Sequence, residues 1–260
     1  MAIPRGSGLY RLVRFVVRQL AFAYFRLGVR GVSRLPVRGP VIIAGNHPNV
    51  LDGILLVAVS PRPVRFLIAE ELYFHRYLHW LFAGLGGIPV YRTRSENGDA
   101  LRAAVAALQR GEVLAIFPEG TTADRGRMHE VKRGVGILAC RSGAPVVPLG
   151  ILGSDAAYPH GTRVPRPRRI TMVFGEARRF PRAATPQVPD RLLARTLELT
   201  RLRILQTMAH AAADWTAQEE ASLGKRVRIA LSACVVLPLA SFLHATANPS
   251  LDPAMRPRAA

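Results

Sequence analysis

Short, nearly continuous apolar runs alternate along this chain with segments of helical periodicity, and this alternation is the strongest constraint on the fold. Runs that are apolar at almost every position suit strands covered on both faces, as in a parallel sheet. The strand candidates are residues 41–44, 64–69, 88–91, 113–117, 146–152 and 170–174. The helix candidates are residues 51–59, 99–110, 131–141 and 191–213, the second and third closed by Gly111 and Gly143. We therefore predict an α/β fold with a central, mostly parallel sheet flanked by helices.

The segment from Leu9 to Leu27 has the pattern of a basic amphipathic helix. At about 100° per residue, Arg11, Arg14 and Arg18 share one narrow arc. The apolar side chains roughly opposite are those of Leu9, Val13, Val16, Leu20 and Leu27. Such a helix suits a position in the plane of a membrane surface, whereas its arginines disfavour a membrane span or a cleaved signal peptide. Packing on the body of the domain is the alternative, and the two roles are compatible.

The charge balance restricts the partners. The formal net charge is +19, and only two of the 36 basic residues are lysines. A field of this sign attracts polyanions, either nucleic acid or an anionic membrane surface. The chain is 49% hydrophobic with a mean hydropathy of +0.15, and no recognition helix or interleaved aromatic pattern of a nucleic-acid-binding module is clear. We therefore expect an anionic membrane surface as the partner, and no nucleic acid.

Two isolated cysteines, Cys140 and Cys234, form no disulfide framework and no metal-ligand spacing, which favours a reducing compartment. We predict three regions: a membrane-associating helix in 1–34, a catalytic domain in 35–215, and an apolar helix with a disordered tail in 216–260. The apolar stretch 229–243 is short for a membrane span. It is a hydrophobic hairpin, a second interfacial element or a helix that caps the core.

His47 and Asp52 carry the clearest catalytic signal. They stand in the run Asn-His-Pro-Asn-Val-Leu-Asp after the first strand candidate, with four residues between them. A carboxylate beside a histidine fixes the ring tautomer and stabilises the imidazolium that forms when the ring takes a proton. Because the substrate can supply the hydroxyl that is deprotonated, no serine or cysteine nucleophile is needed. The pattern indicates group transfer onto an alcohol, with a plain helix start, Asp52 in its first turn, as the alternative.

Four further signals follow in chain order. They are a glycine pair before a strand candidate in 86–92, the run 117–122 after the strand candidate that starts at Val113, Lys132, and a proline within the strand candidate at 146–150. Ligands bind at the carboxyl ends of parallel strands, and there Gly120 exposes backbone N–H groups while Thr121 offers a hydroxyl. Taken singly, each signal is better explained as a turn, a cap or a bulge.

Together, and in this order, the blocks resemble those of the glycerolipid acyltransferase family, typified by bacterial 1-acylglycerol-3-phosphate acyltransferase. The four blocks of that family correspond to residues 46–52, 87–92, 117–121 and 147–149, and the resemblance covers about residues 35–180. Two positions depart from the pattern. Asn49 stands where the family often has serine, and Thr122 stands where it often has an arginine associated with the acceptor's phosphate. Arg125 and Arg127 are candidate substitutes for that arginine.

The resemblance implies an O-acyltransferase that moves a fatty acyl group from an acyl thioester to the hydroxyl of a lysophospholipid in phospholipid biosynthesis. His47 is then the general base and Asp52 its orienting partner. The substrate-binding residues that it implies are Asn46, Arg92, Glu119, Gly120, Thr121, Lys132 and Pro148. Among these, Arg92, Gly120 and Lys132 are expected to hold a phosphate-bearing acceptor, Glu119 a basic group or a glycerol hydroxyl, and Pro148 to line the acyl-chain side.

No metal or cofactor is expected, since acyl-CoA or acyl carrier protein serves as co-substrate. The favoured acceptor is 1-acylglycerol 3-phosphate, with another lysolipid or glycerol 3-phosphate as alternatives. An acyl thioesterase, in which water replaces the alcohol, is the alternative from another class. Because both substrates carry lipid tails, we expect a peripheral or monotopic protein at the cytoplasmic face of the cell membrane.

Overall fold

The computed structural model describes residues 8–76, 79–91, 98–120, 128, 130–159, 162 and 164–216 of the 260-residue chain. The chain divides into two compact units, Met1–Ala212 and Ala213–Ala260. The first unit contains the sheet, its helices and all site residues discussed below. The predicted domain boundaries stay predictions, and the apolar stretch 229–243 lies outside the described residues.

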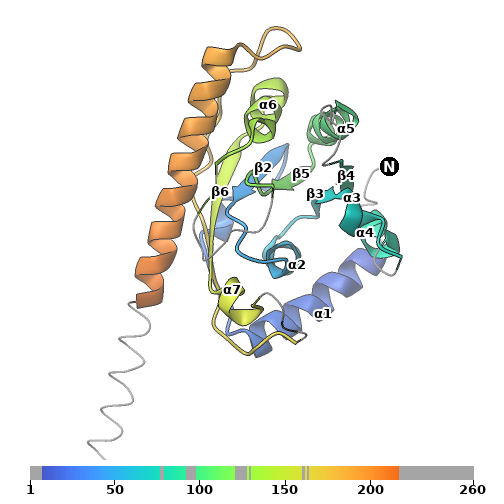
Figure 1. Ribbon diagram of the computed structural model, residues 1–260, viewed down its shortest axis with the longest axis vertical. Helices are drawn as coiled ribbons and strands as arrows, with labels where there is room; N and C mark the ends of the chain where they lie inside the picture. The colour runs from blue at the N-terminus through green and yellow to red at the C-terminus, as the bar shows by residue number, and fades with distance from the viewer. Residues whose placement is uncertain are drawn as a thin grey trace, which may run out of the picture. The chain divides into compact units, whose positions relative to one another are not determined.

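Within the described residues, seven strands form one sheet in the order β1-β7-β6-β2-β5-β3-β4 (Figure 1). Their bounds are β1 (Gly28–Arg30), β2 (Val41–Gly45), β3 (Val64–Ala69), β4 (Ile88–Val90), β5 (Val113–Ile116), β6 (Val146–Leu152) and β7 (Thr171–Phe174). The five strands from β6 to β4 run parallel, whereas β7 pairs antiparallel with β6 and parallel with β1. The predicted α/β fold with a mostly parallel sheet is confirmed.

Helices cover both faces of the sheet. Their bounds are α1 (Gly8–Tyr24), the 3-10 helix η1 (Val32–Arg34), α2 (Leu51–Val59), α3 (Glu70–Tyr73), α4 (His79–Gly84), α5 (Gly98–Gln109), α6 (Arg133–Ser142) and α7 (Ser154–Ala157), and residues 190–216 are also helical. Figure 1 shows α1 and α2 on one side of the sheet and α5 and α6 on the other. Along β2, Ile43 packs into the α1–α2 core and Ile42 into the α5–α6 core. Burial on both faces explains why this strand is apolar throughout.

The predicted strands match β2 to β7, each to within one residue at either end. Gly143 closes α6 as expected, in a left-handed conformation (φ 67°) with its N–H bonded to the Ala139 carbonyl. Five short elements are not predicted from the sequence: β1, η1, α3, α4 and α7. Each has only three or four residues, except α4 with six, and such lengths show little periodicity.

Helix α1 packs on the α2 side of the sheet through a face centred on Tyr10 and Ala21, both buried. The Tyr10 hydroxyl accepts a hydrogen bond from the backbone N–H of Val64 at 3.2 Å, and burial raises its pKa. Arg14 lies half-buried one turn from Tyr10. The predicted arginine arc is therefore divided, because Arg14 is half-buried against the domain while Arg11 and Arg18 are exposed.

The outward face of α1 is apolar. It exposes between 41% and 61% of six large side chains, those of Leu12, Phe15, Val16, Leu20, Phe22 and Tyr24. Val16 and Leu20 belong to the predicted apolar face, and the side chains of Leu9 and Val13 lie outside the described set. A surface helix that is apolar on its outward side as well as its packed side indicates a further apolar environment. No helix among the described residues combines the length and apolar character that a membrane span requires.

Candidate active site

His47 lies just past the carboxyl end of β2, whose neighbours are the parallel strands β5 and β6. An open parallel sheet places ligands at this edge, because the loops that follow adjacent strands meet there. The imidazole stacks on the Phe117 ring, with centroids 4.1 Å apart and an angle of 8° between the ring planes. The His47 side chain is 19% exposed, so a ligand can reach the ring.

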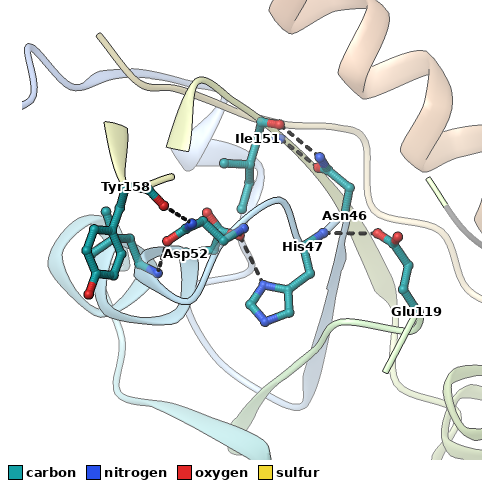
Figure 2. Close-up of polar contacts among 8 residues, drawn as sticks. Asn46, His47, Asp52, Glu119, Ile151 and Tyr158 are labelled. Carbon is teal, nitrogen blue, oxygen red and sulfur yellow. Dashed lines mark hydrogen bonds and ion pairs between the residues drawn. The ribbon is translucent and has the colours of Figure 1, made fainter. Parts of the chain in front are cut away.

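Asp52 reaches back to His47 from the first turn of α2. Nδ1 of His47 and Oδ2 of Asp52 are 3.0 Å apart, and the carboxylate is fully buried. The same Oδ2 accepts the backbone N–H of Asn49 at 2.7 Å, while Oδ1 of Asn49 accepts the backbone N–H of Leu51 at 3.1 Å. Asn49 and Asp52 thus satisfy two backbone N–H groups at the start of α2 in an arrangement that resembles a capping box. This arrangement directs the carboxylate toward the imidazole (Figure 2).

The position of the carboxylate indicates which ring nitrogen is free. Burial raises the pKa of Asp52, and hydrogen bonds from His47 and from the Asn49 N–H oppose this by favouring the charged form. Since Oδ2 accepts the Asn49 N–H, we infer that it also accepts the proton on Nδ1 of His47. The lone pair of Nε2 is then available to take a proton from a hydroxyl.

Asn46 and Glu119 hold the backbone around His47 from two other parts of the fold. The Asn46 amide pairs with the backbone of Ile151 in β6, since its Nδ2 donates to the carbonyl and its Oδ1 accepts the N–H, both at 2.8 Å. Oε1 of Glu119, in the turn after β5, accepts the backbone N–H of His47 at 3.0 Å. Both side chains are buried. The structure therefore places these two predicted substrate-binding residues as supports of His47 (Figure 2).

Gly120 and Lys132 lie together beside the same turn. Gly120 has a φ of 70°, and a Cβ built on it would lie 2.4 Å from Nζ of Lys132. The exposed Lys132 side chain thus lies directly over Gly120. Its backbone N–H donates to the Pro118 carbonyl at 2.9 Å, which ties the start of α6 to the turn after β5. An ammonium group is thereby held near the edge of the sheet that carries His47.

The remaining predicted residues fall elsewhere. Arg92 and Thr121 lie outside the described residues, and so do Arg125 and Arg127. Pro148 is in β6, where it lines a small space on the α6 side of the sheet together with Val146, Arg178, Phe180, Thr200 and Arg203. Its contact with an acyl chain stays a prediction. In the part of the chain that the structure describes, no three His, Cys, Asp or Glu side chains gather as a metal site would require.

Sequence reasoning does not single out Phe117, Ser154 or Tyr158, and it gives Asn49 no role. The Asn49 amide donates to the Tyr158 carbonyl at 2.6 Å, and the buried Ser154 begins α7 close to Asp52. The spacing Asn49-x-x-Asp52 resembles that of a capping box and is a signal that identifies Asn49. No local signal marks Ser154 or Tyr158, because their place beside the site depends on the pairing of β6 with β2.

Comparison with known proteins agrees with this geometry. Residues 26–152 match the Acyltransferase family model. The chloroplastic 1-acyl-sn-glycerol-3-phosphate acyltransferase BAT2 of Brassica napus is 24% identical over 143 residues, which is 54% of this chain and 41% of that protein. An uncharacterised protein of Mycobacterium tuberculosis is 32% identical over 179 residues, covering 63% of this chain and 47% of its own length. The 1-acyl-sn-glycerol-3-phosphate acyltransferase of Pseudomonas aeruginosa is 27% identical over 157 residues and 60% of each chain.

A solved structure has the same fold. The crystal structure of the 1-acyl-sn-glycerophosphate acyltransferase PlsC from Thermotoga maritima superposes with a TM-score of 0.59 at 22% identity, over 76% of this chain and 78% of that one. The fold and the site define an α/β protein with a histidine–aspartate pair at the carboxyl edge of a parallel sheet. The match to the Acyltransferase family model covers residues 26–152, and the chain is distantly homologous to 1-acyl-sn-glycerol-3-phosphate acyltransferases. It spans 40–47% of the length of the first curated relatives that it matches.

Proposed function

We propose that this protein transfers a fatty acyl group from an acyl thioester to the hydroxyl of a lysophospholipid, with 1-acylglycerol 3-phosphate as the favoured acceptor. The observation that carries the proposal is the His47–Asp52 pair, 3.0 Å apart, with the ring partly exposed at the edge of the sheet. The match to the Acyltransferase family model supports the same reaction, and so do relatives named for this acceptor.

The geometry supports direct transfer without an acyl-enzyme. Nε2 of His47 takes the proton of the acceptor hydroxyl, and that oxygen attacks the thioester carbonyl carbon. Asp52 stabilises the imidazolium through Nδ1. The tetrahedral oxyanion then collapses, the carbon–sulfur bond breaks, and the imidazolium returns its proton to the departing thiolate. The products are the acylated lipid and a free thiol, carried by coenzyme A or by acyl carrier protein.

Lys132 supports an acceptor that bears phosphate. Its ammonium group lies over Gly120, at the edge of the sheet that also carries His47. A phosphate held there by a point charge would leave the glycerol hydroxyl to approach the imidazole. Arg92 and Thr121, which we propose as further contacts, lie outside the described residues.

We further propose that α1 docks on the cytoplasmic face of the cell membrane as an in-plane helix. Its exposed apolar side chains, Phe15 and Leu20 among them, suit the boundary between headgroups and acyl chains. The exposed Arg11 and Arg18 border that face, and each basic residue near an anionic surface contributes about 1 kcal/mol. A peripheral position of this kind gives access to two substrates that both carry lipid tails.

Acyl transfer is tested with the purified chain, an acyl-CoA or acyl carrier protein donor, and a panel of acceptors. The panel contains lysophosphatidic acid, other lysophospholipids, glycerol 3-phosphate and a sample without acceptor. We expect esterified product with lysophosphatidic acid and a loss of about 10²–10⁴-fold in His47→Gln. His210→Ala, an exposed histidine on the helix at 190–216, is the matched control and should retain full activity. Free fatty acid without acceptor would instead identify a thioesterase, and full activity in His47→Gln would refute the mechanism.

Membrane docking is tested by sedimentation with vesicles of neutral or anionic lipid. Phe15→Ser with Leu20→Ser should weaken binding to both kinds of vesicle, since the loss is apolar area. Arg11→Glu with Arg18→Glu should weaken binding to anionic vesicles only, and more so at low salt. Gln19→Ser, an exposed polar position on the same helix, is the control. Unchanged binding in both double variants would exclude α1 as the docking element.

A further inference from the structure

The two oxygens of the Asp52 carboxylate have unequal surroundings. Oδ2 accepts the Asn49 N–H and contacts Nδ1 of His47. Oδ1 is buried, and no residue in the described part of the chain gives it a hydrogen bond of good geometry. Buried carboxylate oxygens are normally paired, because an unpaired oxygen loses its hydration without replacement. Oδ1 therefore requires a donor.

Ser154 can supply that donor. It is the first residue of α7, it is separated from the end of β6 by Gly153 alone, and its side chain is fully buried. Its Oγ, like Oδ1 of Asp52, has no partner of good geometry among the described residues. Because a hydroxyl rotates about its Cβ–Oγ bond, its hydrogen can turn toward an acceptor within reach.

Ser154 also contributes to the electrostatics of Asp52. Burial raises the pKa of Asp52, and the Ser154 hydroxyl is among the groups that lower it, as a donor to the charged form does. Titratable or charged groups near α2 include Tyr10 and Arg14 of α1, Glu119 after β5, Asp155 and Tyr158 at α7, and His47. Among these, the His47 ring is the group that contacts the carboxylate.

The segment that carries Ser154 is held at both ends against the loop between β2 and α2, which carries His47. Before it, the Asn46 amide pairs with the backbone of Ile151, next to the β2–β6 register pair Gly45 and Leu149. After it, the Tyr158 carbonyl accepts the Asn49 amide at 2.6 Å (Figure 2). The backbone N–H of the same asparagine donates to Asp52. Helix α7 is thus fixed in place behind the carboxylate.

We propose that Ser154 is a positioning residue for the histidine–aspartate pair, whose hydroxyl donates to Oδ1 of Asp52 and keeps the carboxylate ionised and aimed at His47. The proposal rests on the acyl-transfer role of that pair. Ser154 is not needed as a helix cap, because the N-cap of α7 is Gly153, in a left-handed conformation (φ 85°) and without a side-chain cap.

The pH dependence of kcat/KM for acyl transfer tests the proposal. Without the donor, the charged carboxylate is less stable, so the pair takes up its proton at a higher pH. We expect the acidic limb of Ser154→Ala to move up by about one pH unit, with a loss of about tenfold in kcat on that limb and little change in KM. Ser154→Thr retains a hydroxyl and should restore the wild-type limb. Ser154→Cys keeps the volume with a weak donor and should show most of the shift.

Ser60→Ala is the matched control. Ser60 is also fully buried, but it is the C-cap residue that follows α2, and its hydroxyl donates to the Arg62 carbonyl at 2.7 Å. Removing it should cost thermal stability without moving the limb. An equal shift in Ser60→Ala and Ser154→Ala, or no shift in Ser154→Ala and Ser154→Cys, would overturn the proposal.

A measurement without substrate separates this proposal from the proposed function. The ring-proton NMR signals of His47, assigned by comparison with His47→Gln, are followed against pH in the wild type and in Ser154→Ala. We expect their titration midpoint to move up in Ser154→Ala and to stay in place in Ser60→Ala. A moved midpoint in a protein that transfers no acyl group would leave the Ser154 contact standing and reject the function. Acyl transfer by a protein whose His47 midpoint does not move in Ser154→Ala would support the function and reject the Ser154 contact.

Discussion

Glu119 accepts a hydrogen bond from the backbone N–H of His47 at 3.0 Å, although the two residues are 72 positions apart. The Glu119 side chain is buried after β5, and His47 follows β2, so the contact depends on the parallel pairing of these two strands. A negative oxygen on a backbone donor fixes the height of the loop relative to the sheet. The turn that carries Glu119 therefore helps to hold the His47 backbone in place, independently of any contact that either makes with the substrate.

A backbone-anchoring role for Glu119 predicts a specific kinetic pattern. Glu119→Gln retains an oxygen that accepts the His47 N–H and should keep kcat close to the wild-type value. Glu119→Ala removes the acceptor and should lower kcat by about 10–100-fold, because a displaced imidazole no longer meets the hydroxyl. KM for the acceptor should change little in either variant. A large rise in KM in Glu119→Gln would show instead that the carboxylate binds substrate directly.

The charged Asp52 carboxylate should raise kcat but lower the free energy of unfolding at neutral pH. Burial raises its pKa, so the folded state holds this proton more tightly than the unfolded chain does. Stability is therefore lost as the pH rises through the folded pKa, and the charged carboxylate destabilises the fold at neutral pH. Asp52→Asn should lower kcat by about 10³–10⁴-fold. It should raise the melting temperature at pH 7 by about 2–4 °C.

The sign of that stability change is checked by repeating the melting curves in acid. As the pH falls, the wild-type carboxyl becomes neutral and the advantage of Asp52→Asn should disappear. An advantage that is the same at pH 4 and pH 7 would mean that the asparagine acts by packing rather than by removing a buried charge.

The contribution of Glu112 to stability should depend on pH in the opposite sense to that of Asp52. Burial tends to raise its pKa, but hydrogen bonds from Arg65 and Arg110 outweigh burial and lower it. Its stabilising effect is present above the unfolded pKa and is lost as the pH falls through the folded pKa. Glu112→Gln should lose about 1–3 kcal/mol at pH 7, measured by urea denaturation, and the loss should close in acid. Glu176 pairs with Arg34 at the surface, where the two side chains are 73% and 41% exposed. Glu176→Gln should therefore change the free energy of unfolding little at either pH.

The sequence predicts the central part of the fold because that part is covered on both faces. In β2, the neighbours Ile42 and Ile43 are both buried, one in each core, so the strand is recognisable from composition alone. Strand β1 (Gly28–Arg30) is a three-residue edge strand that ends in an exposed arginine, and nothing local distinguishes it from a loop. Its position follows from pairing with β7, about 140 residues later in the chain.

The histidine–aspartate pair is equally local, since an arrangement like a capping box turns the chain within six residues, and the sequence predicts it well. The supports of the pair are not local. Asn46 is predicted to bind substrate, yet both ends of its amide are bonded to Ile151, 105 residues away. A polar side chain in a motif can bind substrate or can bond the protein's own backbone. These two roles are distinguished only once the strand order shows which backbone lies beside it. The faces of α1 divide in the same way, because periodicity alone does not distinguish the apolar residues that pack on the domain, such as Ala21, from those that stay exposed, such as Leu20.

Gly120 and Lys132 provide the last prediction. An alanine at Gly120 would adopt an unfavourable positive φ of 70°, which costs about 1–2 kcal/mol, and its Cβ would lie 2.4 Å from Nζ of Lys132 and displace that flexible side chain. If Lys132 holds the acceptor phosphate, Gly120→Ala should raise KM for lysophosphatidic acid. Lys132→Ala should raise it as well, and the double variant should be no worse than Lys132→Ala, since both changes remove one contact.

Gly39→Ala is the control that separates the two effects of the alanine. Gly39 has a φ of 80° and nothing within 4 Å of a built Cβ, so alanine there carries the same backbone strain without touching a neighbour. It should lower the melting temperature as Gly120→Ala does and leave KM unchanged. Additive rises in KM for Gly120→Ala and Lys132→Ala would show that the glycine acts through its own backbone N–H groups, and the ammonium group would then have a separate role.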